Sequence, residues 1–388
     1  MSTYMENKGL TFAIPALTGY QVLVSLPTKI QELARAPKHV ISFHEAMKDR
    51  LNHRLIMFGF EHNAVDPNDS VPIHVLKVQL RKHMGELRPV IVRRISEAIE
   101  HHLQKSQHSE RIGTWTVSIF AFTKDVTNLV NNQVLFGSDL ASNEDFQKDT
   151  LRYGWDGAIA MEACRLVPGL IASVVAKGIM GWSGAMDRVG KQVTELVKDR
   201  LKARNTKFNI THIDCTEFVI NASRTPAQKA PGRIVQQLVA LLFASAHQLP
   251  MAISWALTML SIHSEYVELL RNEILSLKDE EGAEFSLRKL PLLDCFLRES
   301  SRLNPLDGLS IQRKATKDFT FSDKSRIPAG NLVAVPQQAV MRDEKNYKNP
   351  DTFDPFRFMP SDHHLDPVVN YTDVNWTYPF WGSPVQSW

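Results

Sequence analysis

The chain has 388 residues, of which 43% are hydrophobic and 22% charged, the composition of a globular protein that can bury a substantial core. Its 45 basic and 42 acidic residues give a net charge of only +3, which argues against nucleic acid as a partner. The three cysteines, Cys164, Cys215 and Cys295, are odd in number and widely spaced, so they indicate neither a disulfide framework nor a zinc site. A reducing compartment is therefore expected.

The chain starts with a polar stretch. Met1–Gly9 has the pattern neither of a signal peptide nor of a membrane-spanning helix. The β-prone run Tyr20–Ser25 follows, and Pro27 ends it. A helix is then expected from Thr28 to about Ala36.

Three long stretches come next in which apolar residues recur every three or four positions, the spacing of a helix with one buried face. They are His74–His102, Asp145–Met180 with a break near Pro168-Gly169, and Ser183–Ala203. The polar stretch Asn221–Gly232 separates them from the most apolar part of the chain.

That apolar part, Leu238–Ile262, is long enough to cross a bilayer. It also contains polar residues and a proline that would be costly there: Ser245, His247, Gln248, Pro250 and Ser261. We therefore predict one long, mostly buried central helix of a helical protein and no stable membrane span. The helix should be irregular near His247–Pro250, because proline removes a backbone hydrogen bond and clashes with the preceding turn.

Beyond Asn304-Pro305 the pattern changes to short β-prone runs and turns. Pro350, Pro355 and Pro360 recur every five residues, which forbids helix and predicts an ordered meander. Because helical patterns come first, short strands later, and no strand–helix–strand alternation is present, the fold class is mostly α with a minor β part.

A charged motif stands out in the helix predicted between Pro291 and Pro305. Glu299 and Arg302 are three residues apart and share one face, which by itself predicts only a weak surface ion pair. Arg357, however, lies between two phenylalanines in the later Pro-rich loop, and a buried guanidinium requires a carboxylate. Glu299 is the candidate partner.

Together these motifs resemble the cytochrome P-450 family of haem-thiolate monooxygenases. In that family a Glu-x-x-Arg helix and a later arginine form a charge network that fixes the meander under the haem, and Glu299, Arg302 and Arg357 match it. His263–Ile274 resembles the helix after the central one, and Arg326–Gly330 resembles a Pro-x-Gly strand pair. The resemblance implies a single P-450-like domain over residues 1–388, shortened at both ends and without the N-terminal anchor.

The resemblance also implies haem b as cofactor. It assigns Arg313 to a haem propionate, with an ordinary exposed basic residue beside Lys314 as the alternative. Trp381 and Gly382 resemble the opening of the haem-binding loop. The family's ligating cysteine would fall at Trp388, and an indole nitrogen cannot bind iron, so no metal ligand is identified.

In the central helix, His247 and Gln248 align with a family pair, an acidic residue or histidine followed by threonine, that helps deliver protons during oxygen activation. His247 fits this role, whereas Gln248 cannot ionise and could at most order a water. The alternative for His247 is a histidine that is satisfied inside the core.

The resemblance is to fungal members of secondary metabolism. It implies oxidation or hydroxylation of an apolar metabolite, a terpenoid or similar, with O2 and electrons from an NADPH-dependent reductase. Without the thiolate ligand the chain as written is expected to be inactive. The family is anchored in the endoplasmic reticulum membrane, so a chain without the anchor would be cytoplasmic or peripheral.

Two other readings remain open. The chain could be a non-catalytic relic that binds an apolar ligand without haem chemistry. A helical membrane-associated scaffold would explain the apolar helix, but it would not explain the three charged residues of the Glu-x-x-Arg motif and the later loop.

Overall fold

The computed structural model describes residues 9–16, 19–61, 71–105, 107–109, 114–204, 212–277, 290–359 and 369–387. The chain separates into two compact units. The first unit is Met1–Met47 with Ala252–Trp388, and the second is Lys48–Met251. That residues 1–388 act as one domain stays a prediction.

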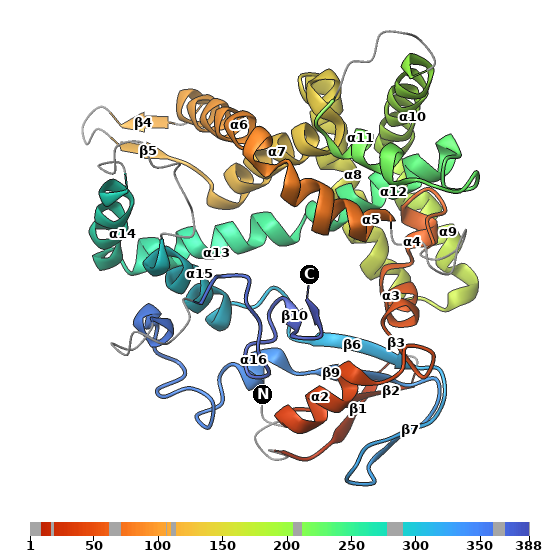
Figure 1. The fold of residues 1–388 in the computed structure, drawn as a ribbon, viewed down its shortest axis with the longest axis vertical. Helices are drawn as coiled ribbons and strands as arrows, with labels where there is room; N and C mark the ends of the chain where they lie inside the picture. Colours follow the sequence, from red (N-terminus) through yellow and green to blue (C-terminus); the bar gives the residue numbers. More distant parts are fainter. Residues whose placement is uncertain are drawn as a thin grey trace. The chain divides into compact units, whose positions relative to one another are not determined.

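The first unit contains a five-stranded sheet that joins both ends of the sequence (Figure 1). Its strands are β1 (Phe12–Ala16), β2 (Gly19–Leu23), β3 (Ile41–Ser42), β6 (Ser310–Ala315) and β9 (Leu332–Val335), in the order β1-β2-β9-β6-β3. Only the β2–β9 pair is parallel among these strands. Alternate residues of β6 are buried, as expected for a strand with one face on the core.

Two helices of the first unit, α2 (Pro27–Arg35) and α16 (Gln337–Val340), share a buried apolar cluster with the sheet. Its other described helical elements are α14 (Glu265–Ser276), α15 (Pro291–Leu303) and the 3-10 turn η3 (Pro355–Phe358). Two pairs of two-residue strands complete the described part of this unit: β7 (Phe319–Thr320) with β8 (Arg326–Ile327), and β10 (Gly382–Ser383) with β11 (Gln386–Ser387). The prediction that the proline spacing forbids helix was wrong at η3, because proline fits the first position of a helical turn.

The described part of the second unit is helical, apart from the strand pair β4 (Gln107–Ser109) and β5 (Thr114–Thr116). Its helices are α4 (His53–Ile56), α5 (Val71–His74), the π-helix η1 (Val75–Leu80), α6 (Met84–Lys105), α7 (Ile119–Ala141), α8 (Glu144–Arg165), α9 (Gly169–Trp182), α10 (Ala185–Ala203), α11 (Cys215–Ala222) and α12 (Pro231–Ser245). One core cluster, with Phe136, Phe146, Tyr153 and Leu238 fully buried, joins these helices except α6, which packs against α7. α3 (Phe43–Leu51) and α13 (Gln248–Ile262) each have residues in both units.

Most long helices follow the predicted pattern, with local differences. The stretch predicted as His74–His102 is divided, because the π-helix η1 precedes α6. The predicted break at Pro168-Gly169 separates α8 from α9. The mostly helical class with a minor β part is confirmed.

The prediction for the central helix was right about the irregularity and wrong about the burial. α12 ends at Ser245 and α13 begins at Gln248, so the helix is broken beside His247. α12 is buried along most of its length, but Ile262 in α13 is 65% exposed. The composition of the segment favours a helix, but its burial depends on which other elements pack against it. Among the described residues, those of α14 and α15 pack against α13 around Met259.

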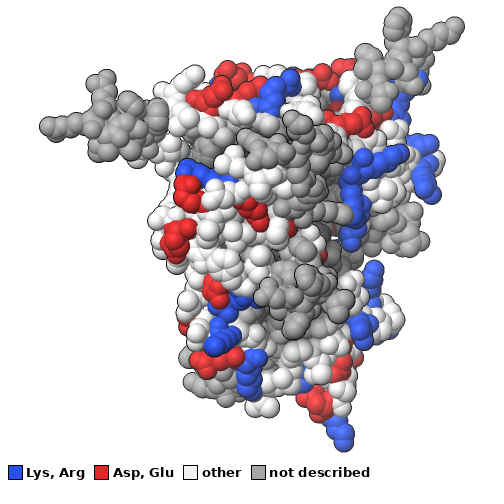
Figure 2. All heavy atoms as spheres, turned by 60° about the vertical axis from the view of Figure 1, so that its left-hand side comes forward, with Lys and Arg blue, Asp and Glu red and all other residues white. Residues whose placement is uncertain are grey.

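Among the described residues, the combined stretch Pro231–Ile262 is long and apolar enough to cross a membrane, and a third of its most apolar window is buried. Only as a pair bent by 75° would α9 and α10 pass the same test. Core helices of soluble proteins also meet this criterion, so length and composition do not decide the matter. Basic and acidic side chains both occur across the face shown in Figure 2, in keeping with the small net charge.

Candidate functional site

The candidate site is organised by α15, which begins with Pro291 at its first turn and ends before Asn304-Pro305. Its C-terminal half is buried on nearly every side, including the charged residues Arg298, Glu299 and Arg302. Buried charges are tolerated only when each is paired and hydrogen-bonded. The partners of these three residues therefore determine what the helix holds in place.

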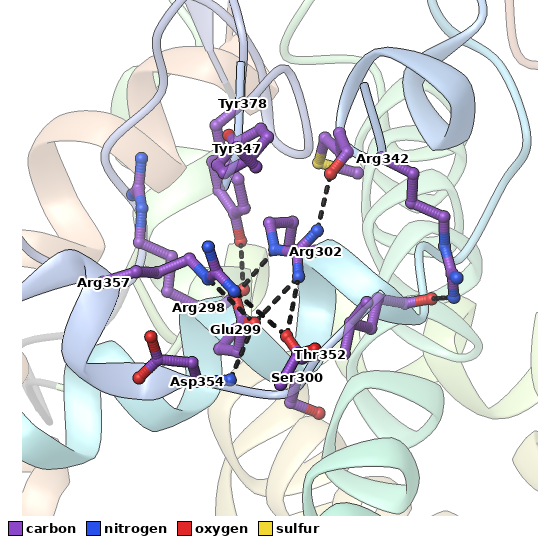
Figure 3. Close-up of polar contacts among 12 residues, drawn as sticks. Arg298, Glu299, Ser300, Arg302, Arg342, Tyr347, Thr352, Asp354, Arg357 and Tyr378 are labelled. Atoms are coloured by element: carbon purple, nitrogen blue, oxygen red, sulfur yellow. Dashed lines mark hydrogen bonds and ion pairs between the residues drawn. The ribbon is translucent and has the colours of Figure 1, made fainter. Parts of the chain in front are cut away.

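Glu299 accepts hydrogen bonds from two arginines (Figure 3). Arg302 Nε donates to Oε2 at 2.7 Å and Nη2 donates to Oε1 at 2.8 Å, the bidentate geometry of a strong pair. Arg357 Nε donates to Oε1 at 3.1 Å. The side chains of Glu299 and Arg302 are fully buried and that of Arg357 is 11% exposed.

The arginines use their remaining donors on backbone carbonyls of the loop after α16. Arg302 Nη1 donates to the Met341 oxygen at 2.7 Å, and Arg357 Nη1 donates to the Lys348 oxygen at 2.8 Å. The backbone N–H of Asp354 donates to Glu299 Oε1 at 3.0 Å. The network thus attaches residues 341–357 to α15 through both charge pairing and backbone hydrogen bonds.

Sequence reasoning missed a further buried arginine, Arg298. Its guanidinium lies 3.9 Å from the centre of the Tyr378 ring, and Nη1 donates to the oxygens of Asn370 and Asp373. Burial lowers the pKa of Arg298. These contacts attach the segment before the β10–β11 hairpin to the same helix. In the sequence Arg298 is only one more basic residue of a predicted helix, so the pattern did not indicate its burial.

Arg313, assigned by resemblance to a haem propionate, lies on β6 and is only 6% exposed. Its Nη1 donates to the oxygen of Gln312 at 2.9 Å, and its guanidinium lies 5.1 Å from the centre of the Phe43 ring. Burial lowers the pKa of Arg313 to about 10. The alternative of an ordinary exposed basic residue is therefore wrong.

Trp381 and Gly382 form the start of the β10–β11 hairpin. Gly382 has a φ of 112°, a conformation that favours glycine. The Trp381 ring meets Tyr371 and Phe380 edge-on, and its buried Nε1 has no hydrogen-bond partner among the described residues. A buried indole N–H of this kind is a donor available to a bound group. Trp388 lies outside the described residues.

All three cysteines are buried in helices remote in sequence from this hairpin: Cys164 in α8, Cys215 in α11 and Cys295 in α15. Burial raises the pKa values of Cys215 and Cys295 to about 12, which keeps them as thiols. The described residues also contain no group of three or more His, Cys, Asp or Glu placed to hold a metal ion. The residues present could therefore contact a haem through donors such as Arg313 and Trp381, but they do not supply its thiolate.

His247 and Gln248 lie in the second unit, whereas the arginine–glutamate network, Arg313 and Trp381 lie in the first. His247 Nε2 lies 2.9 Å from the Gly154 oxygen, and Nδ1 lies 3.1 Å from Lys124 Nζ. Both ring nitrogens are therefore used in hydrogen bonds, which favours a structural role for His247. Gln248 is exposed.

Comparison with known proteins identifies the fold and the relatives. A sequence model described as cytochrome P450, here written P-450, matches residues 73–371. Cytochrome P-450 monooxygenase 71 of Postia placenta is 27% identical over 359 residues, which cover 91% of this chain and 70% of that protein. Cytochrome P-450 monooxygenase ltmQ of Epichloe festucae var. lolii is 25% identical over 397 residues, covering 96% of this chain and 73% of that protein.

Solved structures share the fold at lower identity. A cyanobacterial P-450 with retinoic acid bound has a TM-score of 0.71 at 18% identity and covers 100% of this chain and 81% of its own. A zebra fish P-450 with progesterone has a TM-score of 0.72 at 15% identity, covering 99% of this chain and 85% of its own. At these identities the likeness concerns the fold alone.

Proposed function

The chain belongs to the cytochrome P-450 family. We propose that the reaction of its intact relatives, and of its own descent, is the haem-dependent oxidation of an apolar secondary metabolite, a terpenoid or similar. The observation that carries this proposal is the family match over residues 73–371 together with fungal monooxygenase relatives along most of the chain. The family implies two partners, an apolar small-molecule substrate and an NADPH-dependent reductase.

The arrangement of this chain's residues supports a scaffold role for Glu299, Arg302 and Arg357. They hold the loop that leads toward the Trp381–Gly382 turn, and Arg298 holds the segment just before it. Arg313 and the Trp381 indole N–H are the donors we assign to the carboxylate edge of a haem. When haem is bound through a cysteine thiolate, it supplies the iron that activates O2.

Residues 1–388 contain no cysteine after Cys295, and each of the three cysteines is held in a helix. We therefore propose that this polypeptide does not by itself carry out the family reaction, since oxygen activation depends on thiolate ligation.

The test is the absorption spectrum of the purified polypeptide reconstituted with haem, reduced and exposed to carbon monoxide. We expect either no bound haem or a Soret band of the histidine-ligated type, because none of the three cysteines is placed as a ligand. A band at the thiolate position, well to the red, would overturn the proposal.

A paired substitution tests the assignment of Arg313. If the reconstituted polypeptide binds haem, Arg313→Met should weaken that binding by about tenfold or more, because a charge-assisted hydrogen bond to a carboxylate is lost. Lys314→Met, the neighbouring basic residue on the other face of β6, should leave haem binding unchanged. Equal effects of both substitutions on the haem titration would remove Arg313 from the site.

A further inference from the structure

The break between α12 and α13 has a cause in the sequence. In an unbroken helix the backbone N–H of residue 250 would donate to the carbonyl oxygen of Ala246. That residue is Pro250, which has no N–H. Because a partly buried carbonyl without a donor costs free energy, the oxygen of Ala246 requires a donor from another element.

The donor comes from α7. Lys124 Nζ donates to the Ala246 oxygen at 3.0 Å, and Asn131 Nδ2 donates to the neighbouring Ser245 oxygen at 3.3 Å. Lys124 and Asn131 are seven residues apart, about two helical turns, and so share one face of α7. Two side chains thus replace backbone donors at the end of α12, where the helix dipole also favours a cation.

The same ammonium group fixes the protonation of His247. An ammonium can only donate, so Nδ1 of His247, 3.1 Å from Lys124 Nζ, must be the bare acceptor. The Gly154 oxygen can only accept a hydrogen bond, so Nε2 of His247, 2.9 Å away, must carry the ring proton and act as the hydrogen-bond donor. His247 is therefore a neutral imidazole that connects the break to α8.

The surroundings agree with a neutral ring. Burial and then the charge of Lys124 lower the pKa of His247, and the hydrogen bond to Gly154 opposes them in part. Burial also lowers the pKa of Lys124, whose Nζ lies 5.0 Å from the centre of the Trp155 ring. The described groups that face His247 are the Lys124 ammonium from α7, the Gly154 carbonyl and Trp155 from α8, and Phe243 from α12.

We propose that Lys124 is a positioning residue that replaces the donor missing at Pro250 and holds the break between α12 and α13 through Ala246 and His247. In this arrangement His247 connects the break to α8 by hydrogen bonds and does not act as a general acid that delivers protons. The inference stands on the contacts of the second unit alone and does not depend on haem binding.

The protonation of His247 can be measured on the unsubstituted chain. In protein labelled with 15N at histidine, long-range NMR correlations distinguish the two neutral tautomers from the charged ring, and His247→Gln assigns the signal. We expect the neutral form with its proton on Nε2 at neutral pH. A proton on Nδ1, or a charged ring at neutral pH, would overturn the proposal.

A double-mutant cycle tests the replacement itself. The Met251 N–H donates to the His247 oxygen and reports on the first turn of α13. Lys124→Met should speed hydrogen exchange at this amide by about tenfold, the effect of losing one good hydrogen bond. In the Pro250→Ala background the same substitution should have much less effect, because the restored backbone N–H can donate to the Ala246 oxygen.

The control is Lys148→Met, which removes an exposed lysine of α8 and should leave exchange at Met251 unchanged. If Lys124→Met has the same effect with and without Pro250→Ala, the two residues are not coupled and the replacement is refuted. If Lys124→Met does not fold, the tautomer of His247 in the unsubstituted protein still decides the case.

Discussion

Single residues show how burial changes the meaning of one motif. The spacing Glu-x-x-Arg occurs at Glu268 and Arg271 in α14 and again at Glu299 and Arg302 in α15. The first pair has its hydrogen bond at 2.6 Å but is largely exposed to solvent. The second pair is fully buried and also binds Arg357. Screening by water makes the first pair weak, whereas the second is needed to neutralise buried cations.

Glu299→Gln should therefore lower the free energy of unfolding by roughly 3–5 kcal/mol, because it leaves two buried guanidinium groups without a carboxylate. Urea denaturation of the purified protein measures the change. Glu268→Gln is the matched control, with the same spacing to its arginine in an exposed pair, and should have little effect. A similarly small loss from Glu299→Gln would mean that the network does not stabilise the fold.

At the scale of elements, the contact between α8 and α12 depends on a glycine. A Cβ atom at Gly157 would lie 2.6 Å from Cε2 of Phe243, a buried ring of α12. The absence of a side chain at Gly157 therefore lets the two helices approach each other. By contrast, a Cβ atom at Gly178 in α9 would meet nothing within 4 Å.

Gly157→Ala should destabilise the protein by about 1–3 kcal/mol, since the ring of Phe243 would have to move within a packed core. Gly178→Ala, also within a helix, should instead stabilise it by about 0.5–1 kcal/mol through helix propensity. Thermal unfolding of the two variants measures both signs. Stabilisation by Gly157→Ala would show that α8 and α12 are not in close contact.

At the scale of the whole molecule, stability depends on pH through each ionisable group whose pKa differs between the folded and unfolded states. His247 is such a group, because its pKa in the folded protein is lowered from 6.5. Between 6.5 and that lower value the unfolded chain binds more protons than the folded one. The stability that the neutral ring contributes is thus fully present above pH 6.5 and is lost as the pH falls below it.

His247→Gln should accordingly flatten the fall in unfolding free energy below pH 6.5, since an amide does not titrate. Denaturation in urea at a series of pH values measures the slope for both proteins. His101→Gln, at an exposed position of α6, is the control for loss of an imidazole. If the unfolding free energy of His247→Gln falls with pH as steeply as that of the unsubstituted protein, His247 does not contribute to the acid sensitivity of the fold.

The sequence by itself determined the properties that depend on local pattern. Helical periodicity located α8, α9 and α10, and proline located the break beside His247 and both ends of α15. The aromatic residues around Arg357 predicted that it would be partly buried, as it is, and the ordered motifs indicated the family. These features follow from residues close together in the chain, so no tertiary contact is needed to read them.

Only the tertiary structure decided which surfaces meet. It buries most of α12 but leaves most of α13 only partly buried or exposed, and it brings Lys124 to a carbonyl more than a hundred residues away. It also buries Arg298 beneath Tyr378, while Arg271, a basic residue of the neighbouring helix, remains exposed. Such pairings depend on contacts between distant segments, and the free energy of a buried charge depends on those contacts rather than on the residue's own neighbours in sequence.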